Sequence, residues 1–235
     1  MLTAGIRELA TLVLQPCCAG CGAPTRTPPA CRTCRLSVPE VACRVPAPLP
    51  ARVRQVWAAA PYESPVKELV NAYKDRGQRC LERPLGAALA AAVRQCGSPS
   101  AVQPTRRLLL VPAPSAGRAL RRRGYDPVRR LAAVAAERLA EAGTDVTVLP
   151  ALRHVRSVSD QSGLTAGARA RNLSGAFAVR PRLLRSTAGA VVVLVDDVMT
   201  SGATLAEMAR ALGAAGVAVQ GAAVVAVTVL RGSPR

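Results

Sequence analysis

Apolar residues follow two different spacings along the chain beyond residue 54. Residues 190–195 form a continuous apolar run rich in valine, which is typical of a strand buried on both faces of a parallel sheet. Elsewhere the apolar positions recur at the i, i+3, i+4 and i+7 spacing of one helical face, as at Val66, Leu69, Val70 and Tyr73. Pro65 suits the first turn of that helix, and Gly77 lies near its end.

Together these patterns predict an alternation of helices and strands. The predicted helices are residues 65–77, 81–95, 127–142 and 203–215. The predicted strands are residues 107–111, 145–149, 190–195 and 217–229, the last as one strand or two. This alternation predicts an α/β domain with a parallel sheet flanked by helices. Residues 150–189 show no period, and we expect a functional loop or flap there.

The region before residue 55 has a different texture. Residues 17–50 are crowded with Cys, Pro and Arg and have no sustained period, so we expect them to be held by something other than an apolar core. Residues 1–16 have apolar positions at helical spacing, which predicts a helix and not a signal peptide. We therefore divide the chain into an N-terminal helix with a Cys-rich module at 1–54 and an α/β domain at 55–235.

Two C-x2-C pairs stand out among the eight cysteines: Cys18-Ala-Gly-Cys21 and Cys31-Arg-Thr-Cys34. Two such pairs supply the four thiolates of a structural zinc site, so the module is predicted to be zinc-ribbon-like. Cys17 is an alternative to Cys18, and Cys43 is a fifth candidate or a spectator. Two other interpretations stay open, namely a knuckle that no longer binds metal and a redox pair. Cys80 and Cys96 lie on apolar helical faces and are expected in the core.

The charge balance favours anionic partners. Lys and Arg total 32 against 14 Asp and Glu, a net charge of +18, and Lys67 and Lys74 are the only lysines. Such a charge suits polyphosphates or nucleic acids, while a GC-rich genome is the alternative explanation for so many arginines. Aromatic residues make up 2% of the chain, which argues against a base-stacking platform for single-stranded nucleic acid.

The apolar runs are too short for a membrane helix, which needs about 20 residues. We therefore expect no membrane insertion and a cytoplasmic location, where cysteines serve as metal ligands or thiols more often than as disulfides.

The most informative segment joins a buried strand to a helix start. Asp196 and Asp197 lie at the C-terminal end of the strand. A loop of small and polar residues follows at Thr200, Ser201, Gly202, Ala203 and Thr204. Ligands of open α/β sheets bind at this edge, and a helix start offers N–H groups to a phosphate. The adjacent carboxylates suit ribose hydroxyls and Mg²⁺. A simple strand-turn-helix with a capping side chain explains Thr200 or Ser201 but not the two acids.

This segment resembles the signature of type I phosphoribosyltransferases, which use phosphoribosyl pyrophosphate (PRPP). Two further segments resemble the ComF family over essentially the whole chain. One runs from Val111-Pro-Ala-Pro-Ser115 to Tyr125, and the other is residues 154–177 with Gln161-Ser-Gly-Leu164, Arg169, Asn172 and Gly175-Ala-Phe177. The resemblance implies a zinc module joined to a phosphoribosyltransferase-like domain, and a link to natural competence and DNA uptake.

The resemblance also implies roles for residues of this chain. Asp196 and Asp197 would hold the ribose hydroxyls, and residues 200–204 the 5-phosphate. The turn with Pro112 and Ala113 would face the pyrophosphate, and residues 154–177 would form the flap. Candidate cations for pyrophosphate or nucleic-acid phosphate are Arg121, Arg122, Arg123, Arg169 and Lys74. For Lys74 the alternative is an ordinary cation at a helix C-terminus.

Two departures from the family stand in this sequence. Family members usually carry a further C-x-x-C where this chain has only Cys43, and commonly read Arg-Gly-Phe-Asn-Gln where this chain has Arg123-Gly-Tyr-Asp-Pro127.

Two functions follow as hypotheses. The first is phosphoribosyl transfer from Mg-PRPP to a nitrogen acceptor, in which Mg²⁺ and arginines stabilise the leaving group. The second is a non-catalytic adaptor that binds single-stranded DNA together with competence or recombination proteins.

Overall fold

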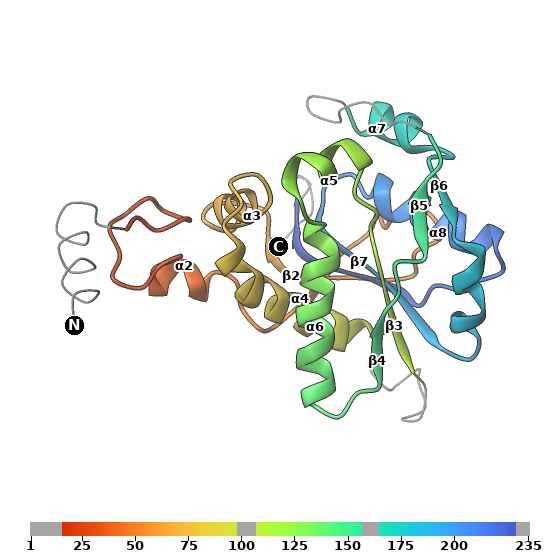
Figure 1. Cartoon of the computed structure of the whole chain (residues 1–235), viewed down its shortest axis with the longest axis horizontal. Helices are drawn as coiled ribbons and strands as arrows, with labels where there is room; N and C mark the ends of the chain where they lie inside the picture. The colour runs from red at the N-terminus through yellow and green to blue at the C-terminus, as the bar shows by residue number, and fades with distance from the viewer. Residues whose placement is uncertain (1–15, 98–106, 157–164, 229–235) are drawn as a thin grey trace.

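The computed structural model describes residues 16–97, 107–156 and 165–228 (Figure 1). The predicted N-terminal helix and the motif at 161–164 therefore lie outside the described residues, apart from Pro16.

A six-stranded sheet forms the centre of the molecule, in the order β1-β2-β8-β7-β3-β4. β1 is antiparallel to β2, and all other neighbours are parallel. In chain order the strands are β1 (Cys43–Arg44), β2 (Val56–Pro61), β3 (Leu108–Pro112), β4 (Val146–Val148), β7 (Val191–Met199) and β8 (Gly221–Val227). The predicted parallel sheet is confirmed, and residues 217–229 contribute one strand to it.

Three of the four predicted strands have continuous apolar runs, whereas β4 reads Val-Thr-Val. β3 is buried along its whole length, and so is β7 from Val191 to Asp197, because helices cover both faces of the sheet. β7 is longer than the predicted 190–195 and carries Asp196 and Asp197 inside the strand. β1 and β2 were missed, since β1 has only two residues and β2 reads as an alanine-rich run.

The four predicted helices are confirmed as α3 (Val66–Lys74), α4 (Glu82–Cys96), α6 (Pro127–Glu141) and α8 (Ala203–Ala214). α6 begins as its sequence predicts, because the Asp126 side chain accepts a hydrogen bond from Arg129 N at 3.1 Å and Pro127 occupies the first helical position. Outside residues 150–189, two short α-helices were missed: α2 (Arg32–Leu36) and α5 (Gly117–Arg123). α5 buries none of its residues, so its sequence lacks the apolar spacing from which a helix is predicted.

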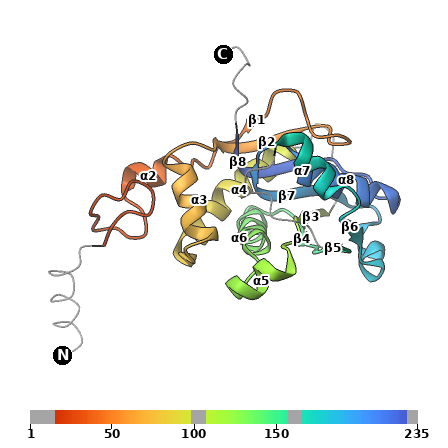
Figure 2. The same cartoon turned by 90° about the horizontal axis from the view of Figure 1, so that it is seen from above.

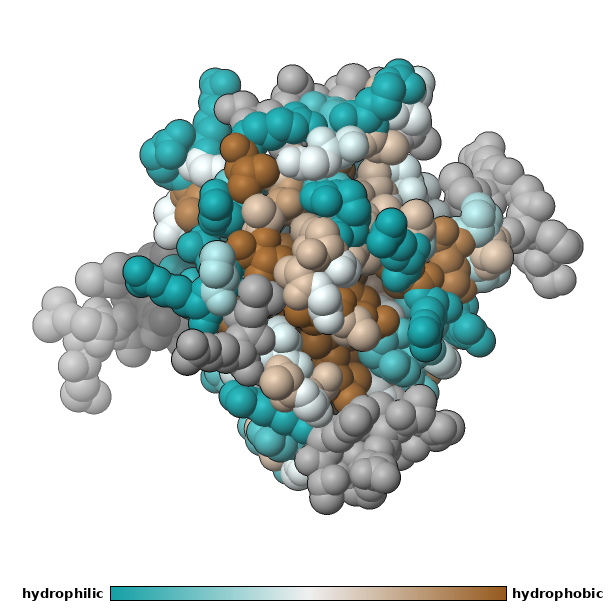
Figure 3. Space-filling view, turned by 90° about the vertical axis from the view of Figure 1, so that its right-hand side faces the viewer, coloured by the Kyte–Doolittle hydropathy of each residue, from teal (hydrophilic) through white to brown (hydrophobic). Residues whose placement is uncertain are grey.

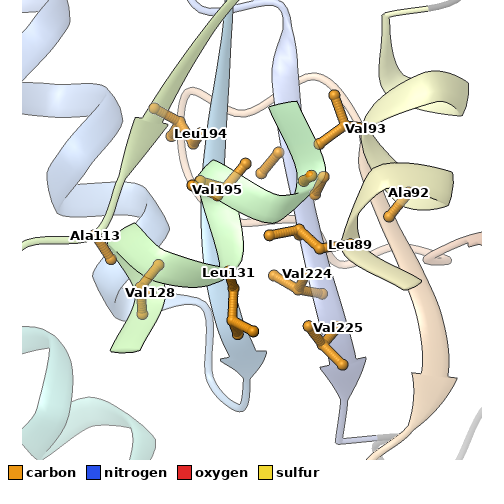
Figure 4. Packing of buried hydrophobic residues seen from close by; sticks show 14 of the residues in the cluster. Leu89, Ala92, Val93, Ala113, Val128, Leu131, Leu194, Val195, Val224 and Val225 are labelled. Carbon is orange, nitrogen blue, oxygen red and sulfur yellow. The ribbon is translucent and has the colours of Figure 1, made fainter. Parts of the chain in front are cut away.

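The helices cover the two faces of the sheet (Figures 1 and 2). The chain moves from β2 through α4 to β3 and through α6 to β4 in one direction, but from β7 through α8 to β8 in the other. Right-handed crossovers therefore place α8 on the face opposite α4 and α6. Leu89 and Val93 of α4 and Leu131 of α6 pack with Val195 and Val225 of the sheet (Figure 4).

Residues 150–189 were predicted as a loop or flap; an irregular loop is wrong for most of them, whereas a role as a flap stays a prediction. They contain a two-stranded antiparallel sheet, a helix and a 3-10 segment: β5 (Leu152–His154), α7 (Ala166–Leu173), β6 (Phe177–Val179) and η2 (Pro181–Thr187). Each strand has three residues, too few for a periodic signal. Buried Glu207 of α8 accepts a hydrogen bond from Phe177 N at 3.1 Å, which holds β6 against α8.

The small sheet and α8 lie on the side of the molecule shown at the right of Figure 1. That face has a central band of apolar surface framed by hydrophilic side chains (Figure 3). None of the described helices combines the length and the apolar character needed to cross a bilayer.

The Cys-rich segment lies beside α3 (Figures 1 and 2). Part of the segment before residue 55 also joins the sheet: β1 pairs with β2, and Val45 N donates to Val56 O at 2.8 Å. The division into domains at residues 54 and 55 stays a prediction. Cys96 is buried as expected, whereas Cys80 is exposed because it lies in the turn before α4 and not on that helix's apolar face.

Candidate functional site

The strand order contains one point at which the chain turns in opposite directions. β3 and β7 are neighbours, but the chain continues from β3 toward β4 and from β7 toward β8. At such a switch point the loops after the two strands diverge and leave a crevice, which is where open α/β sheets bind ligands. The two segments predicted to bind PRPP, after Pro112 and after Asp197, both lie at this edge.

A small hollow lies over the end of β7. Asp196 and the loop residues predicted to bind the 5-phosphate line it: Thr200, Ser201, Gly202, Ala203 and Thr204. The loop opens α8, whose first N–H groups have no partner within the helix and are available to a phosphate. The hollow therefore combines the helix start with one of the two predicted carboxylates.

Gly202 is required by the shape of this loop. Its φ is +74°, the left-handed region that glycine adopts without strain. A Cβ at this position would lie 2.6 Å from Cγ of Pro50. The segment before β2 thus packs directly on the first turn of α8.

The two aspartates have different surroundings, since successive side chains of a strand point to opposite faces. Asp196 lines the hollow, and its Oδ1 accepts a hydrogen bond from Asp197 N at 2.9 Å. Asp197 is 2% exposed; its Oδ1 accepts from Val198 N at 2.8 Å, and its Oδ2 lies 2.7 Å from Nζ of Lys74. That oxygen has no hydrogen bond of good geometry besides this ion pair.

The electrostatics of this pair favour a cation beside Asp196. Burial, together with the charge of Asp197, raises the pKa of Asp196 to about 8, although Lys74 opposes the shift. Burial would lower the pKa of Lys74, but the carboxylates of Asp197 and Asp196 outweigh it and raise that pKa to about 12. Lys74 is therefore a cation at neutral pH. A positive charge bound beside Asp196 would lower the pKa of this carboxyl and favour its ionised form.

The loop after β3 forms the opposite side of the switch point. Pro112 and Ala113 are buried, and Ala113 N donates to Val195 O at 2.9 Å. His154, the only histidine of the chain, lies in β5. Its Nε2 donates to Pro114 O at 3.0 Å, and its ring packs perpendicular to that of Phe177, with 4.9 Å between the ring centroids. The small sheet is thus tied to the predicted pyrophosphate turn.

The structure brings one predicted arginine to the loop. Arg169 of α7 donates from Nη1 to Oγ1 of Thr200 at 3.1 Å. Arg123 instead pairs with Asp75 at 2.7 Å, and Arg121 and Arg122 are exposed on the last turn of α5. None of these three α5 arginines is among the residues that line the hollow.

Sequence reasoning missed Tyr62 and Asn71. Tyr62 follows β2, and its hydroxyl donates to Oδ1 of Asn71 at 3.0 Å. Burial raises the pKa of Tyr62. Lys74 lowers this pKa and Asp197 raises it, so the phenol lies close enough to the ion pair to interact with both charges. Only the strand that precedes Tyr62 could have revealed its place at this edge, and that strand was not predicted.

The structure also gathers four cysteines of the N-terminal segment. The Sγ atoms of Cys18, Cys21, Cys31 and Cys34 all lie within 4.8 Å of one another. Gly20 N and Cys31 N donate to Cys18 Sγ at 3.4 and 3.2 Å. Burial would raise the pKa of Cys18, but the backbone N–H groups of Cys21, Cys31 and Gly20, together with the Cys34 thiol, outweigh it and lower that pKa to about 6.

This arrangement suits a thiolate-bound metal such as zinc, which prefers four sulfur ligands in tetrahedral geometry. Within the described residues, Cys17 and Cys43 are not part of the four-cysteine group.

Residues 120–234 match the family of the phosphoribosyl transferase domain. The chain carries a phosphoribosyltransferase-like domain. The match includes the strand, loop and helix around Asp196 and Thr200 as well as Arg169, whereas Lys74 and the four cysteines lie before it. No curated protein matches the chain.

Proposed function

We propose that this protein is a ComF-type phosphoribosyltransferase that binds PRPP with Mg²⁺ and transfers the phosphoribosyl group to a nitrogen acceptor. One observation carries the proposal: a carboxylate and the open start of a helix share one hollow at the switch point of a phosphoribosyltransferase-like sheet.

Each part of PRPP has a matching group in this arrangement. The N–H groups and hydroxyls of residues 200–204 suit the 5-phosphate, and Asp196, which lines the same hollow, suits the ribose hydroxyls. Asp197 was predicted to share that role, but its carboxylate is buried against Lys74 and does not line the hollow. Arg169, which already reaches Thr200, supplies positive charge beside them, and the turn at Pro112 and Ala113 faces the pyrophosphate. Lys74 adds a fixed cation behind the two carboxylates.

The residues present also fit Mg²⁺. Asp196 offers carboxylate oxygens, the ligands that this hard cation prefers, and burial and the charge of Asp197 raise its pKa, so a bound cation would stabilise its ionised form. When bound with PRPP, Mg²⁺ would stabilise the charge of the departing pyrophosphate. The chain's own contribution is to position the sugar from Asp196 and the phosphate from the α8 start, and to add positive charge through Arg169.

The four-cysteine group is proposed to hold structural zinc, which replaces the apolar core that the short Cys-rich segment lacks. The protein is proposed to act in the cytoplasm.

A second function is favoured by the charge. The net charge is +18, and Arg118, Arg121 and Arg122 are exposed on α5. These arginines suit the backbone of single-stranded DNA, in an adaptor that acts with competence or recombination proteins during DNA uptake. Binding of this kind should weaken steeply with salt, so a flat salt response of a labelled oligonucleotide would count against it.

The test of the main proposal is calorimetric titration with PRPP, with and without Mg²⁺. We expect Mg²⁺-linked binding by the wild type, its loss in the Asp196→Asn, Asp197→Asn double variant, and its retention in Asp145→Asn, an exposed aspartate at the other edge of the sheet. Absence of binding by the folded wild-type protein would overturn the proposal. Where binding is found, release of pyrophosphate with a panel of nitrogen bases identifies the acceptor.

A further inference from the structure

The metal-site candidate packs directly against α3. Gly20, between Cys18 and Cys21, is so close to this helix that a Cβ there would lie 3.3 Å from Cδ2 of Leu69 and 2.9 Å from Sγ of Cys34. Leu69 is 2% exposed. The first cysteine pair therefore rests on the buried face of α3 with no room for a larger side chain.

A hydrogen bond reinforces this contact at the end of the helix. Nη2 of Arg76 donates to Ala19 O at 3.2 Å, and the same nitrogen donates to Glu68 O at 3.2 Å. Ala19 belongs to the Cys18–Cys21 pair, so the guanidinium joins the knuckle to the helix. Arg76 N also donates to Asn71 O at 3.3 Å, which keeps the residues after Lys74 close to the last turn.

The same end of α3 reaches the proposed PRPP site. Lys74, two residues before Arg76, forms the 2.7 Å ion pair with Asp197. Asp75, between them, pairs with Arg123 of α5 at 2.7 Å. Three consecutive residues thus connect the cysteine group, the aspartate strand and α5.

We expect the end of α3 to be less ordered when one of these partners is lost, because its last residues are held by contacts outside the helix. Without a bound metal the four cysteines would be thiols with no shared ion to hold them together, so we expect the knuckle to loosen. The Lys74 side chain would then lose its conformational freedom only when PRPP binds. This loss of entropy would make PRPP binding weaker.

We propose that Arg76 is a positioning residue through which metal bound at the four cysteines fixes Lys74 against Asp197 and so tightens PRPP binding. The effect on PRPP rests on the proposed function, whereas the effect on Lys74 does not. Because linkage is reciprocal, Mg-PRPP must tighten metal binding at the cysteines by the same factor.

The first measurement is independent of PRPP. Lys67 and Lys74 are the only lysines, and Lys67 is exposed on the same helix, so it serves as an internal reference. The amines are acetylated briefly and quantified by mass spectrometry. We expect Lys74 to react faster relative to Lys67 after zinc is removed, and also in zinc-loaded Arg76→Ala, which keeps all four cysteines. Arg83→Ala, an exposed arginine of α4, is the matched control and should react as wild type.

The second measurement is calorimetry of Mg-PRPP with the zinc-loaded proteins, and competition for zinc with a chromophoric chelator. Arg76→Ala should bind Mg-PRPP about fivefold more weakly than wild type and Arg83→Ala equally well. Mg-PRPP should tighten zinc binding by the wild type by a similar factor and not by Arg76→Ala.

Two results would overturn the inference: unchanged Lys74 reactivity in both metal-free and Arg76→Ala protein, or full PRPP affinity in Arg76→Ala. If the wild type binds no PRPP, the proposed function fails, and the reactivity of Lys74 still decides whether the metal site positions it.

Discussion

The ammonium of Lys74 lies 2.7 Å from Oδ2 of Asp197, so the last turn of α3 is joined to the end of β7. The Asp197 side chain is 3% exposed and that of Lys74 34%. The lysine is thus both a cation at a helix C-terminus, where it suits the helix dipole, and the partner of a buried carboxylate beside the proposed ligand site.

Removing the ammonium alone should destabilise the protein. Lys74→Met leaves a buried carboxylate unpaired, and we expect a loss of about 2–3 kcal/mol, below the ~3–5 kcal/mol of a fully buried pair because Lys74 is partly solvated. Denaturant unfolding measures the loss. The Lys74→Met, Asp197→Asn double variant should recover most of it, since the charge that needed a partner is gone. Losses that simply add in the double variant would mean that the ion pair contributes nothing.

The raised pKa of Asp196 predicts a pH effect on stability. Its pKa moves from 3.8 to about 8, chiefly through burial, so the folded state holds a proton that the unfolded state has lost between these values. This contribution to stability is fully present below pH 4 and is lost as the pH rises toward 8. Asp196→Asn should flatten this part of the unfolding profile, whereas Asp145→Asn should not. Identical slopes in wild type and Asp196→Asn would contradict the assignment.

The same pKa predicts proton release on binding. Mg-PRPP requires the ionised Asp196 carboxylate, so at pH 7 binding should expel protons and its affinity should rise with pH up to about 8. Calorimetry in buffers of different ionisation enthalpy counts the protons released. The prediction fails if the observed heat is independent of the buffer.

Metal content should separate the four clustered cysteines from the others. Cys34→Ser removes one ligand from the group, and we expect it to lose zinc, because a structural site needs all four thiolates. Cys43→Ser is the matched control and should keep about one zinc per chain, as should Cys17→Ser. Elemental analysis of the purified proteins decides, and retention of zinc by Cys34→Ser would remove it from the metal site.

Gly202 and Gly216 allow the loop contact with Pro50 to be measured. Both have positive φ, +74° and +76°, but a Cβ on Gly216 would meet nothing within 4 Å. Gly216→Ala should therefore lower the free energy of unfolding by about 1–2 kcal/mol, the effect of the left-handed backbone conformation alone. Gly202→Ala should cost more and weaken Mg-PRPP binding, because its Cβ collides with Pro50. Equal unfolding free energies of the two variants would show that Pro50 exerts no constraint.

The sequence predicted those elements that have a long apolar pattern of their own. α4, with ten buried residues, and β7, with its valine run, were placed within a few residues of their observed bounds. β2, β5 and β6 were missed, because short or alanine-rich strands are stabilised mainly by the neighbours they pair with. Nothing local distinguishes such a strand from a loop.

The candidate site divides in the same way. The two C-x2-C pairs and the Asp196–Thr204 segment were found from the sequence, because each set of groups lies within a short stretch of continuous chain. The partner of Lys74, the approach of Arg169 to Thr200 and the bond from Arg76 to Ala19 were decided only by the tertiary structure. These contacts join separate segments of the chain, and local spacing carries no information about which distant segment the fold will bring near.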